Sequence, residues 1–135
     1  MSAFTRLQAV ICQRSIDQLM KDNPGIFLAV VATTDGFEVV SAPVRVDEGG
    51  EASRLAAMSS SMLALAEAMV READLSICND VLVDCAAGRL LLLSVPVSDA
   101  RFVLCVGARG DTTLGHVLAA GRLCAEEMSK RLQLS

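Results

Sequence analysis

Two neighbouring segments in the second half of the chain are apolar at almost every position. Residues 89–95 contain the run LLLLSV, and residues 101–106 contain the run FVLCV. A strand with one solvated face alternates apolar and polar side chains, so continuous apolar runs indicate strands that are buried on both faces of a sheet. A sheet of this kind needs helices on both of its sides.

Three further segments complete the predicted sheet. Residues 77–84 precede the apolar pair and contain one asparagine and two aspartates, which is typical of an edge strand. Nearer the N-terminus, residues 26–33 (IFLAVVAT) and 37–42 (FEVVSA) flank an Asp-Gly pair, a strong hairpin signal because the turn requires positive φ. A polar connection at residues 44–50 follows this hairpin. Short turns between consecutive strands predict an antiparallel sheet.

Helical periodicity predicts three helices around this sheet, at residues 4–22, 52–72 and 112–132. Asp111 or Thr112 is expected to cap the last of them. The resulting order, α-β-β-α-β-β-β-α, predicts a single α+β domain over residues 1–135. Its five-stranded antiparallel sheet would have the middle helix on one face and the two terminal helices on the other.

The chain is more apolar than one small domain requires. Hydrophobic residues make up 53% of the sequence, above the usual share of about 45–50%. A spanning helix needs about 20 mostly apolar residues, whereas the uncharged stretch at residues 55–66 is shorter and contains three serines. Arg6 and Arg14 interrupt any signal-peptide core. We therefore expect a cytoplasmic protein that does not enter a membrane and that buries its surplus apolar surface against a partner.

The middle predicted helix is the best candidate for that contact. Its larger apolar residues recur at alternating spacings of three and four, the pattern of helices that pack on one another. Most of its other residues are alanine and serine, which allow a neighbouring helix or sheet to approach closely. Together with the polar edge strand that follows, this helix predicts an isologous homodimer that buries roughly 1,200–2,000 Å².

No catalytic, cofactor-binding or metal-binding motif is recognisable. The five cysteines are odd in number and include no C-x-x-C pair, which favours reduced, packed thiols. His116 is the only histidine, so a His-based metal cluster cannot form. Residues 107–110 (GARG) lack the spacing of a phosphate-binding loop and are interpreted as a tight turn before the last helix. We expect a protein without enzyme activity, cofactor or metal.

Charge and composition also argue against nucleic-acid binding. The net charge is −4, and the basic residues are scattered rather than clustered. The chain contains no Trp or Tyr that could stack on bases. A nucleic-acid partner is therefore not expected.

The order of elements and three sequence motifs resemble the roadblock/LC7 domain family. The motifs are TTDGFEVVSA at the first hairpin, RLAAMSSSMLALAEAM on the middle helix and DTTLGHVLAAGRLCAEEM on the last helix. The resemblance extends from about residue 18 to residue 132. It implies a profilin-like fold and a homodimer or related heterodimer. In such dimers the middle helices pack side by side, and the third strands pair into one continuous sheet.

The resemblance also implies a function. Bacterial members of the family are often linked to small Ras-like GTPases, whose nucleotide cycle or location they regulate. The chain is therefore predicted to be a non-enzymatic, dimeric adaptor or regulator of such a GTPase. The predicted contact residues are Leu55, Met58, Ser59, Met62, Leu65, Ala66 and Met69 of the middle helix, and Cys78, Asp80 and Leu82 of the edge strand.

Two alternatives stay open from the sequence. Five-stranded antiparallel sheets with flanking helices also build small-molecule sensors of the PAS or GAF type, which usually enclose a pocket between sheet and helices. The same dimer could equally serve as a scaffold subunit without a GTPase partner.

Overall fold

The computed structural model describes residues 4–43, 50–98 and 100–135. Its elements are, in chain order, α1 (Arg6–Asp22), β1 (Ile26–Thr33), β2 (Glu38–Ala42), α2 (Glu51–Glu72), β3 (Asp80–Cys85), β4 (Gly88–Pro96), β5 (Arg101–Arg109) and α3 (Leu114–Leu134). This order confirms the predicted α-β-β-α-β-β-β-α arrangement. The predicted polar connection at residues 44–50 lies, except for Gly50, outside the described residues.

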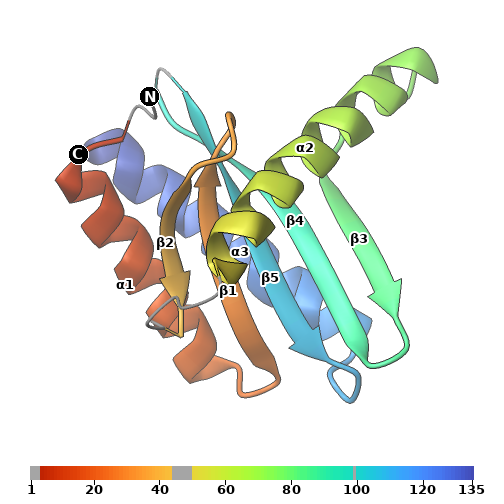
Figure 1. Ribbon diagram of the computed structural model, residues 1–135, viewed down its shortest axis with the longest axis horizontal. Helices are drawn as coiled ribbons and strands as arrows, with labels where there is room; N and C mark the ends of the chain where they lie inside the picture. The colour runs from red at the N-terminus through yellow and green to blue at the C-terminus, as the bar shows by residue number, and fades with distance from the viewer. Residues whose placement is uncertain (1–3, 44–49, 99) are drawn as a thin grey trace.

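The strands form one antiparallel sheet in the order β2-β1-β5-β4-β3 (Figure 1). The two halves of the chain meet where β1 pairs with β5, for example Val30 with Cys105. The strands β4 and β5, predicted to be buried, lie inside the sheet. The predicted edge strand, β3, lies at one edge, and β2 lies at the other.

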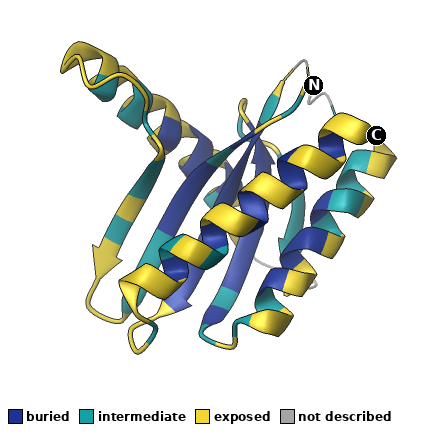
Figure 2. Ribbon diagram, turned by 180° about the vertical axis from the view of Figure 1, so that it is seen from behind, coloured by how far each residue is buried: buried dark blue, intermediate teal, exposed yellow. Residues whose placement is uncertain are grey.

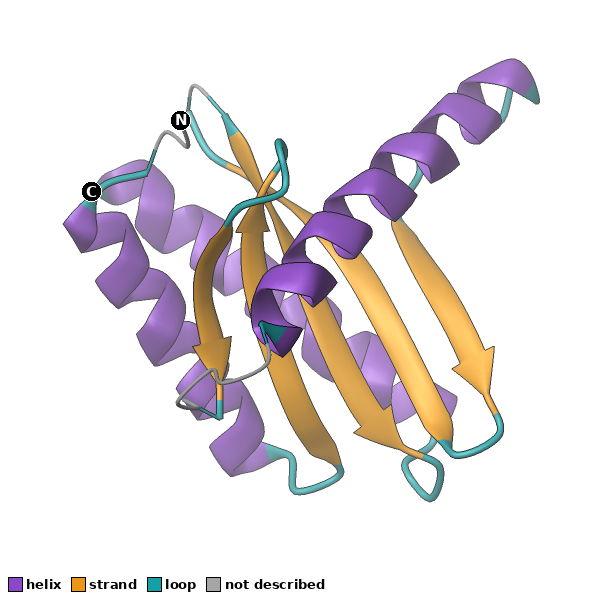
Figure 3. Ribbon diagram, in the orientation of Figure 1, coloured by secondary structure: helices purple, strands orange, loops and turns teal. Residues whose placement is uncertain are grey.

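Helices cover both faces of this sheet. Helices α1 and α3 lie side by side on one face, which we call the back, and α2 crosses the other, which we call the front (Figures 1 and 3). Successive side chains of β4 show why both layers are needed. Leu91 and Leu93 enter the core on the back, whereas Leu92 enters the core on the front. The predicted burial of this strand on both faces is confirmed.

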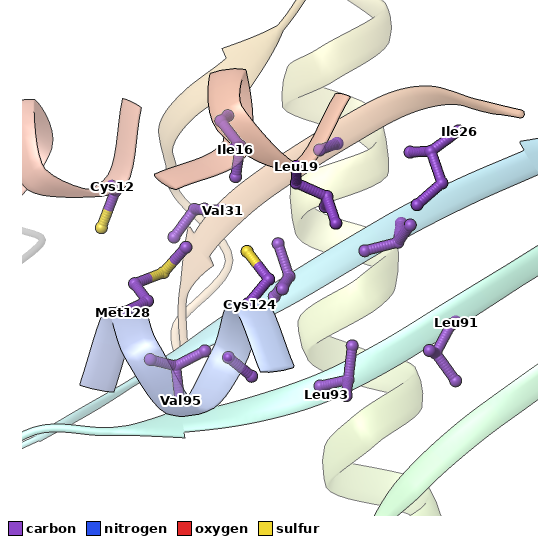
Figure 4. Close-up of a cluster of buried hydrophobic side chains, with 14 of the residues drawn as sticks. Cys12, Ile16, Leu19, Ile26, Val31, Leu91, Leu93, Val95, Cys124 and Met128 are labelled. Atoms are coloured by element: carbon purple, nitrogen blue, oxygen red, sulfur yellow. The ribbon is translucent and has the colours of Figure 1, made fainter. Parts of the chain in front are cut away.

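The two cores differ in the side chains that the helices supply. In the back core, α1 and α3 contribute large residues such as Ile16 and Met128, both fully buried between the helices and the sheet (Figure 4). Seen from behind, both helices turn their buried residues toward the sheet and their exposed ones away (Figure 2). In the front core, α2 contributes Ala56 and Leu63 over residues such as Val103.

Side-chain caps fix the starts of the two back helices. The Thr5 hydroxyl accepts a hydrogen bond from the Gln8 backbone N–H at 3.1 Å, and the Gln8 side chain accepts one from the Thr5 N–H at 2.8 Å. Helix α3 starts later than predicted, because Thr113 rather than Asp111 or Thr112 caps it, with its hydroxyl accepting from the His116 N–H at 3.2 Å. None of the helices in the described residues is long and apolar enough to cross a membrane.

Two strand boundaries also differ from the prediction. Strand β3 begins at Asp80 rather than at Ile77, because Asp74 and Ser76 adopt φ angles of 58° and 74° and turn the chain between α2 and the sheet. Strand β5 continues to Arg109, so most of the predicted turn before α3 is strand. The reason is that Gly107 and Ala108 still pair with β1.

Candidate partner-binding surface

Helix α2 turns its larger apolar side chains away from the sheet. The residues that it buries are mostly small: Ala56, Ser59, Ser60 and Leu63. An amphipathic helix in a monomer normally hides its apolar stripe. The opposite arrangement leaves four side chains in solvent, which we call the outer stripe. Its members and their exposed fractions are Met58 (54%), Met62 (42%), Leu65 (64%) and Met69 (64%).

Small side chains let α2 lie close to its own sheet. The buried Ser60 hydroxyl oxygen lies 2.7 Å from the carbonyl oxygen of Thr33 in β1 and 3.0 Å from that of Ala56, so its hydrogen has an acceptor. At the tip of the first hairpin, a Cβ atom on Gly36 would lie 3.4 Å from the Ala57 Cα atom. The close approach predicted from the alanines and serines therefore occurs within the chain.

Ser59 is not on the surface where the sequence analysis placed it. The residue is only 4% exposed and lies beneath the helix, where its hydroxyl faces the thiol of Cys105 in β5. Ser59 follows Ala56 by three residues and precedes Leu63 by four, so all three share one face of an α-helix. Contrary to the prediction, Ser59 packs in its own front core.

An ion pair holds the second half of α2 to the sheet. Both terminal guanidinium nitrogens of Arg101, at the start of β5, donate to the Glu67 carboxylate, at 2.5 and 2.6 Å. These hydrogen bonds hold the pKa of Glu67 below its ordinary value. Beyond this pair, the last turns of α2 extend past the sheet (Figure 1). The ion pair therefore tethers α2 to the sheet close to the outer stripe.

The connection after α2 adds more exposed apolar surface. Leu75 is 68% exposed and Ile77 is 76% exposed. The sequence pattern does not predict this contribution, because Ile77 belongs to the predicted edge strand and Leu75 lies outside every predicted element. The sequence does contain a signal for this exposed surface, namely an apolar residue that stands beside a polar edge strand without a predicted apolar contact. Together with the outer stripe, these side chains form the candidate partner-binding surface.

Strand β3 borders that surface and has an open edge. It pairs with β4, and no other strand of the described chain pairs with it. Val81 packs toward the front core, whereas Asp80 points to the back, where Arg122 of α3 donates to its carboxylate at 2.8 Å. Leu82 also faces the back and is 38% exposed. Open backbone groups on an edge strand are a template for pairing with another chain.

The remaining predicted contact residues are half-buried. Leu55 is half-buried and packs against the front core, and Ala66 is half-buried on α2. Cys78 is half-buried just before β3, with its sulfur 3.6 Å from the Asp80 carbonyl oxygen. Burial, reinforced by the carboxylates of Glu67 and Asp80, raises the pKa of the Cys78 thiol. Of the ten predicted contact residues, all except Ser59 are thus at least partly exposed on α2, on β3 or just before β3, with Asp80 and Leu82 on the back of the sheet.

The buried thiols are held in their neutral form. Burial raises the pKa of Cys12 to about 12 and that of Cys124 to about 11, and it also raises the pKa of Cys105. A neutral, buried thiol is a poor nucleophile. Among the residues that the structure describes, no three His, Cys, Asp or Glu side chains come together in a way that could hold a metal ion.

A hollow of about 320 Å³ lies on the back of the molecule, between α1 and α3. Leu19, Ala120 and Cys124 line it, and His116 lies at its rim. It opens between two helices, not between a helix and the sheet, where a PAS or GAF sensor would be expected to enclose its ligand.

These features define a class of protein: a three-layer α+β domain with one antiparallel sheet, a pair of closely packed back helices, and a single front helix with an apolar outer surface. The chain belongs to the Roadblock/LC7 domain family, whose model matches residues 13–108. This membership confirms the predicted family and decides the fold class in favour of the roadblock arrangement over the sensor folds.

Solved structures support the same assignment. MglB of Myxococcus xanthus matches with a TM-score of 0.79 at 17% identity, covering 97% of this chain and 93% of that one. The gliding protein MglB from Thermus thermophilus matches with a TM-score of 0.78 at 11% identity, covering 100% and 97%. A Roadblock/LC7 domain from Streptomyces avermitilis matches with a TM-score of 0.73 at 18% identity, covering 86% and 92%. A search of curated proteins found no match. At these identities the likeness shows the fold.

Proposed function

We propose that this protein is a non-enzymatic homodimer that acts in the cytoplasm, where it binds a small Ras-like GTPase and changes its nucleotide cycle or its location. The observation that carries the proposal is the outer stripe of α2 beside the open edge of β3. Both are exposed in the single chain, and membership of the roadblock family supports their use in binding.

Apolar burial supports the dimer energetically. Each fully buried side chain of the Leu or Met type contributes about 1.5–3 kcal/mol. Because these side chains are only 42–64% exposed in the single chain, four of them from each of two copies would contribute on the order of 7–13 kcal/mol, against an association cost of about 4–15 kcal/mol. The outer stripe therefore offsets much of the cost of a side-by-side dimer of α2 helices with paired β3 strands, whereas one exposed methionine would not.

The shape of the domain supports the same pairing. The last turns of α2 extend past the sheet on the side of β3 (Figure 3). In a dimer joined through β3, these turns would lie over the front of the partner's sheet. Val83 and Leu90 on the front of this sheet are only half-buried in the single chain, so they offer the apolar surface that such a helix needs.

Regulation of a GTPase does not require catalytic residues in this chain. A binding partner shifts an equilibrium between two conformations only as far as its affinities for them differ. The parts of the paired α2 helices that the dimer contact leaves exposed would bind the GTPase, and charged residues near the end of the helix, such as Arg71 and Glu72, would orient it. The proposed regulator therefore binds one nucleotide state of the GTPase more tightly than the other.

A binding assay with purified Ras-like GTPases from the source genome tests this proposal. Each GTPase is loaded with fluorescent GDP or a GTP analogue and titrated with wild type, Leu65→Glu and Leu123→Glu. Leu123, 56% exposed on α3, is the matched control because it places the same charge on the back. We expect wild type and Leu123→Glu to bind alike, and Leu65→Glu to bind at least tenfold more weakly. A dimer that binds no GTPase would contradict the proposal and favour the scaffold alternative.

A further inference from the structure

Strand β3 has a side-chain pattern that is symmetric about Leu82. Residues 80–84 read DVLVD, so two valines flank the leucine and two aspartates flank the valines. The valines face the front and the other three residues face the back. A twofold axis through Leu82 would place every side chain of residues 80–84 opposite one of its own kind.

Twofold symmetry limits the registers in which two β3 strands can pair. When two copies of an edge strand pair antiparallel about an axis perpendicular to the sheet, each face continues across the junction, so one residue must lie on the axis opposite its own copy. The central candidates are Val81, Leu82 and Val83. With Val81 on the axis, Leu82 would face the partner subunit's Asp80. With Val83 on the axis, Leu82 would face the partner subunit's Asp84.

Only the Leu82 register keeps apolar side chains together on both faces. On the front, Val81 faces the partner subunit's Val83, a β-branched pair of the kind that stabilises sheets. On the back, the two Leu82 side chains meet on the axis. The other two registers place a carboxylate against Leu82, which would bury a charge beside an apolar group.

The Leu82 register also places Asp80 opposite the partner subunit's Asp84. Like charges directly opposite one another destabilise a strand pair. Each of these carboxylates, however, already has a guanidinium partner on the back of the sheet. Arg122 donates to Asp80 at 2.8 Å, and the Arg89 Nε lies 3.5 Å from the Asp84 carboxylate. The two ion pairs thus turn a repulsive contact into a neutral cluster of two carboxylates and two guanidiniums.

We propose that two copies of this chain pair through β3 with Leu82 on the twofold axis, and that the Asp80–Arg122 and Asp84–Arg89 ion pairs join across the junction at each end. This inference rests on the proposed dimer and names its register. Because the pattern matches itself, the edge favours a second copy of this chain over strands with unrelated sequences. Arg89 and Arg122 are the residues that permit this selectivity.

Disulfide trapping tests the register. Single cysteines are introduced into a background variant of the whole chain with Cys78→Ser and Cys85→Ser, in which the three remaining cysteines are all buried. Opposed residues in antiparallel strands have Cα atoms about 4.5–5.5 Å apart, within the roughly 4.4–6.8 Å that a disulfide spans. On mild oxidation, Leu82→Cys should form a covalent dimer. Val81→Cys and Val83→Cys should each stay uncrosslinked alone but crosslink when the two are mixed and allowed to exchange subunits.

The outcomes separate the register from the dimer. Self-crosslinking of Val81→Cys or Val83→Cys, in a protein that sediments as a dimer, would overturn the Leu82 register and leave the dimer standing. A background variant that sediments as a monomer would overturn both the dimer and the register. Covalent dimers of Leu82→Cys with no self-crosslinking of the two valine variants would support the proposal.

A second experiment tests the arginines. Arg122→Ala would leave Asp80 facing the partner subunit's Asp84 at both ends of the junction, so the dimer dissociation constant should rise roughly 2- to 30-fold. Adding Asp80→Asn to Arg122→Ala should restore most of the affinity, because it removes the repulsion. An Arg122→Ala dimer as tight as wild type, or a double variant as weak as the single one, would contradict the role of the ion pairs.

Discussion

The two faces of the sheet are covered by helices of opposite character. On the back, α1 and α3 bury large side chains such as Ile16, Leu19 and Met128 against the strands. On the front, α2 buries alanine and serine and leaves Met58 and Leu65 in solvent. Each layer covers one face of the same sheet, yet only the back layer uses most of its large apolar residues for the chain's own core.

One small domain can thus serve two purposes. The back layer provides most of the packing that a single chain needs. The front layer needs only enough burial to hold α2 in place, through Leu63, small residues and the Glu67–Arg101 ion pair. The outer side of α2 is consequently available for association. Substitutions on the two faces should therefore affect different quantities, stability on the back and association on the front.

The largest difference in the free energy of unfolding should be between alanine variants of two methionines, one in each layer. Met128→Ala removes a fully buried side chain from the back core and should lower the free energy of unfolding by about 2–5 kcal/mol. Met58→Ala makes the same change in the outer stripe and should cost far less, with a cost that shrinks as the protein is diluted, because it acts through association. Urea unfolding at several protein concentrations measures both. Equal losses that do not depend on protein concentration would mean that the two layers do not differ in this way.

A pair of alanines tests how tightly α2 packs on its own side. Ala56→Leu enlarges a fully buried residue of the front core and should lower the free energy of unfolding by about 1–3 kcal/mol through overpacking. Ala64→Leu makes the same change at an exposed position of α2 and should alter it by less than about 0.5 kcal/mol. Both are measured by urea unfolding. If Ala56→Leu left the free energy of unfolding unchanged, the front core would not be close-packed.

The smallest effect concerns the ion pair that anchors α2. The folded-state pKa of Glu67 is lowered, so its contribution is full above the ordinary glutamate pKa of about 4.3 and is lost as the pH falls through the lowered value. Because the Arg101 side chain is 40% exposed, the contribution should be about 1 kcal/mol or less. The stability difference between wild type and Glu67→Gln should therefore shrink as the pH is lowered from about 5 toward 3. A difference that is constant over this range would exclude the ion pair as its source.

Much of the fold was predictable from residue patterns. The continuous apolar runs of β4 and β5 required helices on both faces, and the polar character of residues 77–84 placed β3 at an edge. The pairing of β1 with β5 was not predictable in the same way, because the two strands are far apart in the sequence and no turn connects them. Without knowledge of that pairing, the length of β5 and the position of the turn before α3 could not be predicted.

The candidate surface was predictable in its large residues but not in its details. Alternating spacings identified the outer stripe. Ser59 was included as one of the small residues of the helix, and its place on the inner face depends on Ala56 and Leu63 as neighbours. The start of β3 depends on positive φ angles at Asp74 and Ser76, and neither residue type signals such a conformation as glycine does. These features follow from three-dimensional packing rather than from local pattern.

Sedimentation equilibrium of wild type, Met62→Glu and Leu123→Glu tests whether the outer side of α2 is a surface for a second copy of the chain. Wild type and Leu123→Glu should sediment at twice the 14.2 kDa mass of the chain. Met62→Glu, with an unchanged circular dichroism spectrum, should sediment at the mass of one chain, because it places charge in the outer stripe. A monomeric wild type, or a Met62→Glu variant that remains a dimer, would mean that the outer side of α2 is not such a surface.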